Sequence, residues 1–432
     1  MSKSVVKLAH QAFGVIMSIN FMICWAIPIA GMGQLWKLGL KFPITPLYNW
    51  FDRNTYMRKF AASYIYGEEK FSDFFFTSLL IVVNAVVGLG IMFYWQLTTR
   101  GLPYWLIFAY YCSWVGMGGR VMGAAYALAH REGHKKNMYN TTIRKSVGNF
   151  FENWLGLFYG IVPASFTTSH ISIHHQLNGG IGDTFYQWDL NRNSFGDFML
   201  YLTRIFLHMT GYSSCMYYLA NNKESHYKTL SNGGIKYMAG AAIVLAITRS
   251  PSFLFWIYFQ PLLCMTYFLA LINFGFHGFI AFDSKQNPLQ TVNATCIIEG
   301  DDDYWGEDDH MAHHYNPSIY FRDLPAHQQT KVDQFKKQRA SVFKGLSIVE
   351  LSIFILIGKW DLLADHYVDY TGKMERKEIE KMLKVRARAT ECSWEDYQDY
   401  LENPTLEMRE KMKTTKFPDQ WAEVETQGQN EK

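Results

Sequence analysis

The sequence predicts an all-α integral membrane protein, a helical bundle of four core transmembrane helices in two hairpins, with a cytoplasmic helical cap. Two observations predict this class. Several apolar runs are long and uncharged, and the 432-residue chain is 49% hydrophobic but only 18% charged. The mean hydropathy of −0.09 excludes a chain that is nearly all transmembrane helix, so a large polar portion must accompany the spans.

The composition excludes other classes as well. A chain with 17% aromatic residues and a net charge of +3 is neither a disordered segment nor strongly basic, and we expect no nucleic-acid partner. The six cysteines are scattered and form no CxxC motif, so reduced thiols are expected at Cys24, Cys112, Cys215, Cys264, Cys296 and Cys392.

Four apolar segments form the predicted hairpins. Phe74–Leu97 contains about 24 residues, enough to cross about 30 Å of hydrocarbon, and Leu102–Ala129 follows it after a short polar link. Arg120 is the one charged residue inside the second segment, and a charged side chain inside the bilayer is energetically unfavourable. The other hairpin joins Ile235–Thr248 to Phe253–Phe276, and the former covers only about 21 Å without its flanking residues.

Charge predicts the orientation. Basic residues precede the first hairpin, and such segments stay on the cytoplasmic side: Lys37, Lys41, Arg53, Arg58, Lys59 and Lys70. By parity, residues from about 130 to 234 and those after about 278 are cytoplasmic. We expect the membrane to be the endoplasmic reticulum in a eukaryote and the inner membrane in a bacterium.

The chain divides into three predicted parts. Residues 1–70 hold a basic flank and the uncharged run Phe13–Met32, which could span the membrane or enter it and return. Residues 71–340 form the membrane domain. Residues 341–432 contain the apolar segment Ile348–Gly358, which is too short to span the membrane and should rest on the membrane interface or on the cap. The charged tail predicts two helices, Glu375–Ala389 and Trp394–Glu402.

Nine of the 14 histidines fall in four groups. The first cluster is His130 and His134, the second is His170, His174 and His175, the third is His310, His313 and His314, and His277 ends the last apolar run. Residues three or four apart share a helix face, so each cluster should present its imidazoles from one side. The remaining histidines, including His10, His208, His226, His327 and His366, are expected to be ordinary core or surface residues.

Depth places these groups in one layer. His130 lies about 28 residues after the start of the second span, which is about 42 Å along a straight helix and beyond a core of about 30 Å. His277 ends the fourth span at a similar height. Nine imidazoles exceed the capacity of one site, so the sequence predicts a di-metal site in the cap. Iron fits a site that oxidises aliphatic C–H bonds, although the sequence alone does not exclude zinc.

These clusters resemble the histidine boxes of the membrane fatty acid desaturase and hydroxylase superfamily, which includes the integral-membrane alkane hydroxylases. The resemblance covers about residues 70 to 330. It implies two Fe ions, O2 as co-substrate, and metal ligation by His130, His134, His170, His174, His175, His277, His310, His313 and His314. Asn273 matches an asparagine that acts through a water in the acyl-CoA desaturases.

The second cluster departs from the common desaturase pattern. It reads H-x-x-x-H-H, whereas H-x-x-H-H is usual in desaturases. The longer spacing resembles the alkane hydroxylase branch, as do Lys135, the N-x-x-x-H-G motif from Asn273 to Gly278, and Asn316-Pro317. Hydroxylation therefore stays open beside desaturation.

Carboxylates near the clusters could orient the imidazoles by accepting their second N–H. The candidates are Asp183 after the second cluster and Asp301, Asp302, Asp303, Glu307, Asp308 and Asp309 around the third. A solvated acidic loop is the alternative. Aromatic residues of the second span could line a channel for an alkyl chain or pack the bundle: Trp105, Tyr110, Trp114 and Tyr126.

Electrons should come from a separate protein, because the chain has no flavin or nicotinamide fingerprint and no fused heme domain. A cytochrome b5-, ferredoxin- or rubredoxin-like donor could dock on basic residues, which otherwise serve as a positive-inside flank: Lys135, Lys136, Arg144, Lys145 and the run from Lys331 to Arg339.

The leading interpretation is a membrane di-iron oxidoreductase that desaturates an acyl chain in lipid metabolism. The first alternative is an alkane or fatty acid hydroxylase-type monooxygenase. A zinc membrane hydrolase or a metal transporter is a second class, although nine ligands are many for one zinc and transporter sites lie at the midplane. A catalytically silent scaffold with the same fold is a third.

Overall fold

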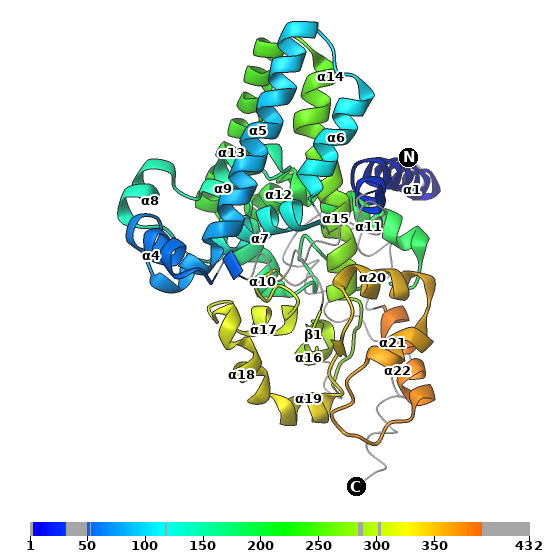
Figure 1. Cartoon of the computed structure of the whole chain (residues 1–432). Helices are drawn as coiled ribbons and strands as arrows, with labels where there is room; N and C mark the ends of the chain where they lie inside the picture. The colour runs from blue at the N-terminus through cyan, green and yellow to red at the C-terminus, as the bar shows by residue number, and fades with distance from the viewer. Residues whose placement is uncertain are drawn as a thin grey trace.

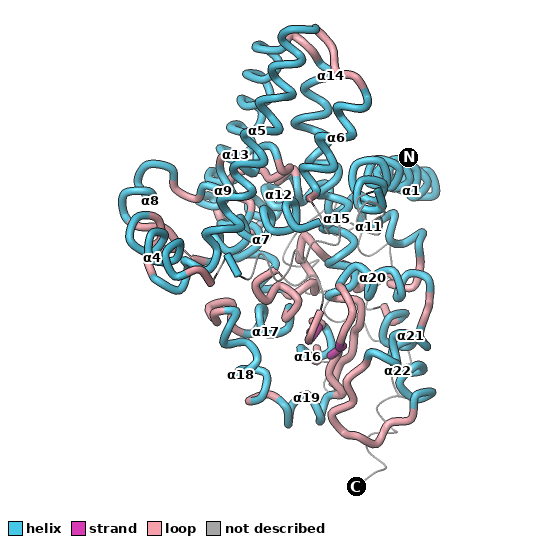
Figure 2. The backbone as a smooth tube through the Cα atoms, viewed as in Figure 1, coloured by secondary structure: helices cyan, strands magenta, loops and turns pink. Residues whose placement is uncertain are grey.

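The computed structural model describes residues 3–31, 50–51, 53–116, 119–135, 137–283, 288–300 and 304–390. Helices make up most of this part of the chain, and two strands of three residues each form a small parallel pair, β1 (Cys296–Ile298) with β2 (Val342–Lys344). Upright helices stand above a layer of shorter helices and loops (Figures 1 and 2). The predicted all-α membrane fold is confirmed.

Four described segments are long and apolar enough to cross a membrane: Ser4–Gly31, Glu69–Thr99, Glu224–Thr248 and Pro251–Phe276. They contain α5 (Phe75–Thr99), α13 (Glu224–Thr248) and the run of α14 (Pro251–Leu254), η6 (Phe255–Phe259) and α15 (Gln260–Phe276). Because α13 has 25 residues, its flanking turns supply the length that Ile235–Thr248 lacks.

The predicted second span is interrupted. Instead of one helix over Leu102–Ala129, α6 (Tyr104–Val115) ends before Gly116, and α7 (Arg120–His134) begins after Gly119. These two glycines have φ angles of 73° and 77°, a left-handed conformation that continues no α-helix. The prediction of a continuous helix is therefore wrong. Arg120 starts α7, and the straight-helix depth estimate for His130 does not hold.

The N-terminal segment is helical and lies against the bundle. Its elements are α1 (Lys3–Phe21) and η1 (Met22–Ala26), with helix continuing to Gly31. The Phe21 ring stacks on Tyr267 of α15 at 4.3 Å between centroids, and Phe13 packs on Phe206 of α11 (Phe195–Met209) at 5.3 Å. Met32, the last residue of the predicted segment, lies outside the described residues.

Most of the remaining elements are short. Between α1 and α13 they are α4 (Thr55–Tyr64), η2 (Glu69–Phe74), α8 (Thr141–Val147), α9 (Phe150–Asn153), η4 (Leu155–Phe158), η5 (Phe166–His174), α10 (His175–Leu177) and α12 (Tyr212–Ala220). After α15 they are α16 (Gln290–Asn293), α17 (His310–Tyr315), η7 (Phe321–Asp323), α18 (Leu324–Gln329), α19 (Val332–Gln338), α20 (Ile348–Ile357), α21 (Trp360–His366) and α22 (Arg376–Arg388).

The C-terminal helices close the lower layer. Helix α20 packs on α15, with Ser352 of α20 against Gly275 of α15. The segment therefore lies against the last apolar span, and its place on the membrane interface or the cap stays a prediction. Helix α22 matches the predicted Glu375–Ala389, whereas Trp394–Glu402 lies outside the described residues. The buried guanidinium of Arg192 donates to the carbonyl of Arg386 at 2.9 Å and so ties α22 to the core.

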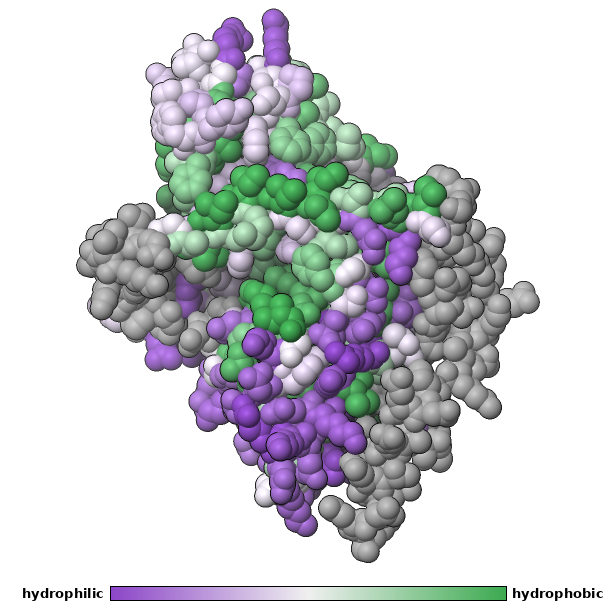
Figure 3. Space-filling view, turned by 90° about the vertical axis from the view of Figure 1, so that its right-hand side faces the viewer, coloured by the Kyte–Doolittle hydropathy of each residue, from purple (hydrophilic) through white to green (hydrophobic). Residues whose placement is uncertain are grey.

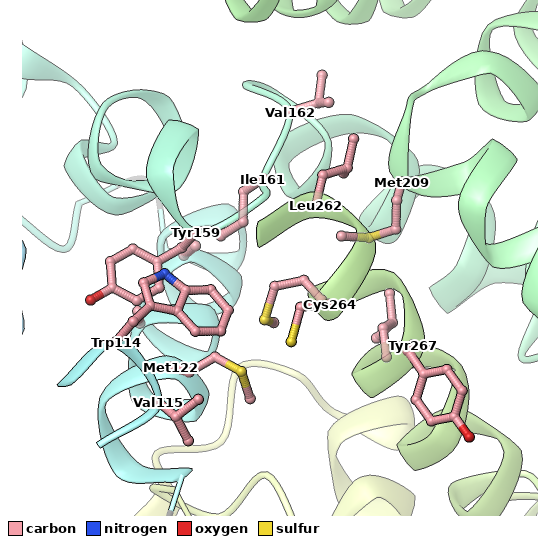
Figure 4. Close-up of a cluster of buried hydrophobic side chains, with 14 of the residues drawn as sticks. Trp114, Val115, Met122, Tyr159, Ile161, Val162, Met209, Leu262, Cys264 and Tyr267 are labelled. Carbon is pink, nitrogen blue, oxygen red and sulfur yellow. The ribbon is translucent and has the colours of Figure 1, made fainter. Parts of the chain in front are cut away.

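A hydrophobic cluster joins α6 and α7 to α15 (Figure 4). Within it, Trp114 stacks on Tyr159 at 5.3 Å and donates its indole N–H to the Phe158 carbonyl at 3.0 Å. The five described cysteines are free thiols, as expected, and Cys392 lies outside the described residues. On the face shown in Figure 3, hydrophobic residues form a band above a hydrophilic lower region.

Candidate metal centre

The structure brings all nine predicted histidines together in two adjoining groups. The five-histidine group contains His130, His134, His170, His175 and His313, and the four-histidine group contains His174, His277, His310 and His314. In each group, one nitrogen per residue lies within 4.8 Å of the others. The groups adjoin, because the rings of His175 and His314 have centroids 4.7 Å apart.

Helix α7 supplies the first pair. His130 and His134 are four residues apart on one face, and their Nε2 atoms lie 3.2 Å apart. Glu307 fixes the first ring, because its Oε2 lies 2.7 Å from His130 Nδ1. A carboxylate only accepts, so the Nδ1 atom carries the proton and the Nε2 atom keeps a bare lone pair.

The second cluster lies on a π-helical segment, η5, and this changes which residues share a face. A π-helix bonds residue i to i+5, as the His170 N–H does to the Ser165 carbonyl at 3.2 Å. His170 and His175 therefore point into the five-histidine group, with Nε2 atoms 2.9 Å apart, while His174 joins the other group. The rings of His170 and His174 lie on one side, as predicted, with centroids 5.4 Å apart, but they belong to different groups.

The third cluster is also divided. His310 and His314 are one α-helical turn apart on α17, and their Nε2 atoms lie 3.0 Å apart in the four-histidine group. His313 points to the five-histidine group. His277 follows the last residue of α15, as predicted, and its Nδ1 atom donates to the Asn293 carbonyl at 2.8 Å.

The nitrogen positions fit two bound cations. Five Nε2 pairs within the groups are separated by 2.7 to 3.2 Å. Bonds of about 2.0–2.1 Å place adjacent nitrogens about 2.9 Å apart in an octahedral site and about 3.4 Å apart in a tetrahedral one. His174 Nε2 and both ring nitrogens of His313 are buried without a hydrogen-bond partner in the described part of the chain.

Six of the imidazoles are held neutral, which is the form that binds a metal. Burial lowers the pKa of each of these side chains, and neighbouring histidines lower it further: His134, His170, His175, His310, His313 and His314. A cluster of buried bases with converging lone pairs is costly without a cation, so the arrangement favours metal binding.

Two of the predicted carboxylates contact the histidines. Asp183 lies 2.8 Å from His174 Nδ1 and accepts the backbone N–H groups of Gly179 and Phe185. Burial opposes its ionisation, yet the His174 ring and these N–H groups hold the pKa of Asp183 below its ordinary value. Glu307 contacts His130 and pairs with Arg131 at 2.9 Å.

The other predicted acids have different places. Asp309 caps α17 by accepting the Ala312 N–H at 3.0 Å, and it accepts a second bond from Gln328 at 2.6 Å. Its observed role is therefore to begin the helix of the third cluster, and the expectation of a direct imidazole contact is wrong. Asp308 lines the neighbouring cavity. Asp301, Asp302 and Asp303 lie outside the described residues.

A mostly apolar cavity opens on the histidines from the bundle side. His130, His170, His174 and His310 line one end, and Ile272, Leu269 and Phe268 of α15 continue the lining away from them. Asn273 also lines it, and the Asn273 Nδ2 atom donates to the Leu269 carbonyl at 3.2 Å.

The aromatic residues predicted to line a channel have different positions. Tyr126 lines the cavity. Trp114 and Tyr110 are buried in the bundle, and Trp105 is 59% exposed and packs edge-on against Trp95. For these three residues, packing is the observed role.

Two buried glutamates that sequence reasoning missed connect the clusters. Glu132, inside the first cluster, accepts the backbone N–H groups of Phe151 and Glu152 at 3.0 and 2.8 Å. The Glu152 carboxylate accepts those of Phe166 and Thr167, at the start of η5. The sequence offered a signal for only one of the two glutamates. Glu132 is a charged residue between His130 and His134, which indicates a buried role if the helix that carries them is buried.

Fold and site together define a helical membrane protein with a histidine-rich candidate di-metal centre beside an apolar cavity. The family model described as "Fatty acid desaturase" matches residues 103–345, more than half of the chain. The chain therefore belongs to the fatty acid desaturase family, and it is a desaturase- or hydroxylase-type oxidoreductase of lipid metabolism. None of the curated proteins and none of the solved structures compared with the chain matches it.

Proposed function

We propose that this protein is a di-iron enzyme that uses O2 and externally supplied electrons to desaturate an acyl chain. The observation that carries the proposal is the convergence of nine imidazoles on two adjoining points at one end of an apolar cavity. Bound iron would supply the oxidising chemistry that unactivated aliphatic C–H bonds require. The nine histidines would hold it, in groups of five and four.

The protein's own residues would orient the centre and keep water out. Asp183 and Glu307 hold protons on His174 Nδ1 and His130 Nδ1, so the Nε2 lone pairs face inward. Ile272, Leu269 and Phe268 would bind the alkyl chain and exclude solvent. Asn273, which lines the same cavity, would act through a water as its counterpart does in acyl-CoA desaturases.

Hydroxylation of an alkyl chain or fatty acid is the alternative outcome. The longer second cluster supports it, because this spacing resembles the alkane hydroxylases and the π-helix of η5 accommodates it. A zinc hydrolase is the less favoured class. Nine histidines in two groups are more ligands than one zinc ion with an open position would need.

Electrons would arrive from a cytochrome b5-, ferredoxin- or rubredoxin-like protein on the cytoplasmic side. Basic residues of the described part of the cap support this partner. Lys135 directly follows the first cluster, and Lys336 and Lys337 lie in the last turn of α19. The basic segment before α5 supports the cytoplasmic placement.

Lipid profiling of a host that expresses the protein tests the proposal. The wild type should add a double bond or hydroxyl to a lipid, and His174→Ala should abolish that product. His366→Ala is the matched control, because His366 lies on α21 and its Nδ1 contacts the Lys344 carbonyl, away from the centre. A profile identical to that of the empty host, with O2 and reductant supplied, would contradict the proposal.

A further inference from the structure

A tenth histidine, His208, lines the same cavity. It lies near the end of α11, and only 5% of the residue's surface is exposed. It belongs to neither histidine group. From the sequence, His208 was expected to be an ordinary core or surface residue. In the structure it is a buried imidazole in the wall of an apolar cavity, and such a group needs a polar partner.

Two hydroxyl groups engage one nitrogen of this ring. Thr184 Oγ1 lies 2.9 Å from His208 Nδ1, and Ser214 Oγ lies 3.4 Å from it. Burial lowers the pKa of His208 to about 3, so the ring is neutral and carries one N–H. When a hydroxyl donates to Nδ1, the N–H is on Nε2, which remains for a group inside the cavity.

The position of His208 relative to the metal centre is suited to substrate recognition. The Phe185 ring lies between them, with its centroid 4.1 Å from that of His208 and 4.5 Å from that of His174. A group bound at His208 would therefore lie close to the four-histidine group without reaching it. Met209, next in the chain, lines the cavity beside it.

The charge of the lining limits the group that can bind. Lys and Arg are absent from the described residues that line the cavity, while Glu307 and Asp308 are present. A buried carboxylate or phosphate would find no Lys or Arg side chain there and would face Glu307 and Asp308, so its desolvation would be unfavourable. A neutral hydroxyl, carbonyl or ester oxygen can accept one hydrogen bond at little cost.

We propose that His208 donates a hydrogen bond to a neutral oxygen of the substrate, which is therefore a long apolar chain bearing a hydroxyl, carbonyl or ester group. This inference rests on the proposed function in one respect, that the cavity holds the substrate. It names a specificity residue that touches the substrate away from the reacting carbon.

Equilibrium binding to the full-length purified protein tests this role without turnover. The probes are hexadecane, 1-hexadecanol, methyl palmitate and palmitate. The wild type should bind the alcohol or the ester about two- to tenfold more tightly than the alkane, the increment of one net hydrogen bond. Palmitate should show no such preference at neutral pH.

Variants assign the preference to the residue. His208→Phe should abolish it while leaving hexadecane binding within about twofold, and His208→Gln should retain part of it through the amide N–H. The control His366→Phe, on α21 and outside the cavity lining, should leave the preference unchanged. The inference is overturned if the wild type has no preference, or if His208→Phe keeps it. If His208→Phe does not fold, His208→Ala takes its place, and the folded His208→Ala variant must then lose the preference. Binding preference without oxidation in the host would instead contradict the proposed function alone.

Discussion

The carboxylate of Glu132 accepts the backbone N–H of Glu152 at 2.8 Å, and the Glu152 carboxylate accepts the backbone N–H of Phe166 at 2.8 Å. These bonds fix the start of η5 relative to α7, so the two helices that carry the first and second clusters are held in register. All the groups are buried, where a lost acceptor leaves a donor unsatisfied.

Glu152→Ala should therefore disturb both stability and the centre. The Glu152 carboxylate also accepts the Thr167 N–H at 3.0 Å and an Asn149 amide N–H at 3.0 Å, so the buried Phe166 N–H and two part-buried donors lose their acceptor. The buried Phe166 N–H left without an acceptor costs about 1–3 kcal/mol, and we expect a lower melting temperature and less bound metal. Thermal unfolding and metal analysis measure the two effects. Glu350→Ala, on the exposed capping box of α20, is the control, and equal behaviour of both variants would refute the role of Glu152.

The π-helix makes a prediction about pairs of substitutions. His170 and His175 belong to one group and His174 to the other, so His170→Ala/His175→Ala should lose one metal ion and keep about one per chain. His170→Ala/His174→Ala should damage both sites and lose both. Metal content of the purified double variants distinguishes these outcomes. The reverse ranking would show that the second cluster is α-helical in the protein.

Asp183→Asn should weaken metal binding by about 10- to 100-fold, because the neutral amide no longer holds the proton on His174 as a carboxylate does. Retention of metal during titration with a chelator measures the change. Asp309→Asn is a matched control, since asparagine caps a helix as well as aspartate and Asp309 contacts backbone and Gln328 rather than a ring. Equal metal loss from both variants would contradict the assignment.

Leu269→Trp should shorten the chain that the enzyme accepts. Leu269 lines the cavity about two helical turns before the His277 position, and a larger side chain there fills the end remote from the histidines. Product analysis in the expressing host should shift towards shorter chains. Val86→Trp, on an exposed position of α5, should leave the products unchanged. An unaltered profile for Leu269→Trp would place the substrate elsewhere.

The sequence predicted the composition of the centre better than its internal arrangement. The spacing of His130 and His134 sufficed, because α7 is a regular α-helix there and residues i and i+4 share its face. The same rule placed His170 and His174 on one side, but it did not assign them to different groups or bring His175 beside His170, since nothing in the local sequence marks a π-helix. The partners of Asp309 and Glu152 depend on tertiary contacts with Gln328 and η5, which spacing along the chain does not encode.

The spans show a similar division. Phe74–Leu97 was predicted well because an uncharged run of that length has few alternatives, and α5 covers it from Phe75 onward. Leu102–Ala129 is also uncharged apart from Arg120, but Gly116 and Gly119 adopt positive φ angles that end one helix and begin another. Glycine in an apolar run is also common in continuous membrane helices, so the break could not be inferred from composition.

The central claim is that the nine histidines hold two iron ions, and metal analysis of the purified full-length protein tests it most directly. The account predicts about two irons per chain, falling to about one in His170→Ala/His175→Ala. One zinc per chain, with no iron after expression in iron-replete medium, would contradict it and favour the hydrolase class.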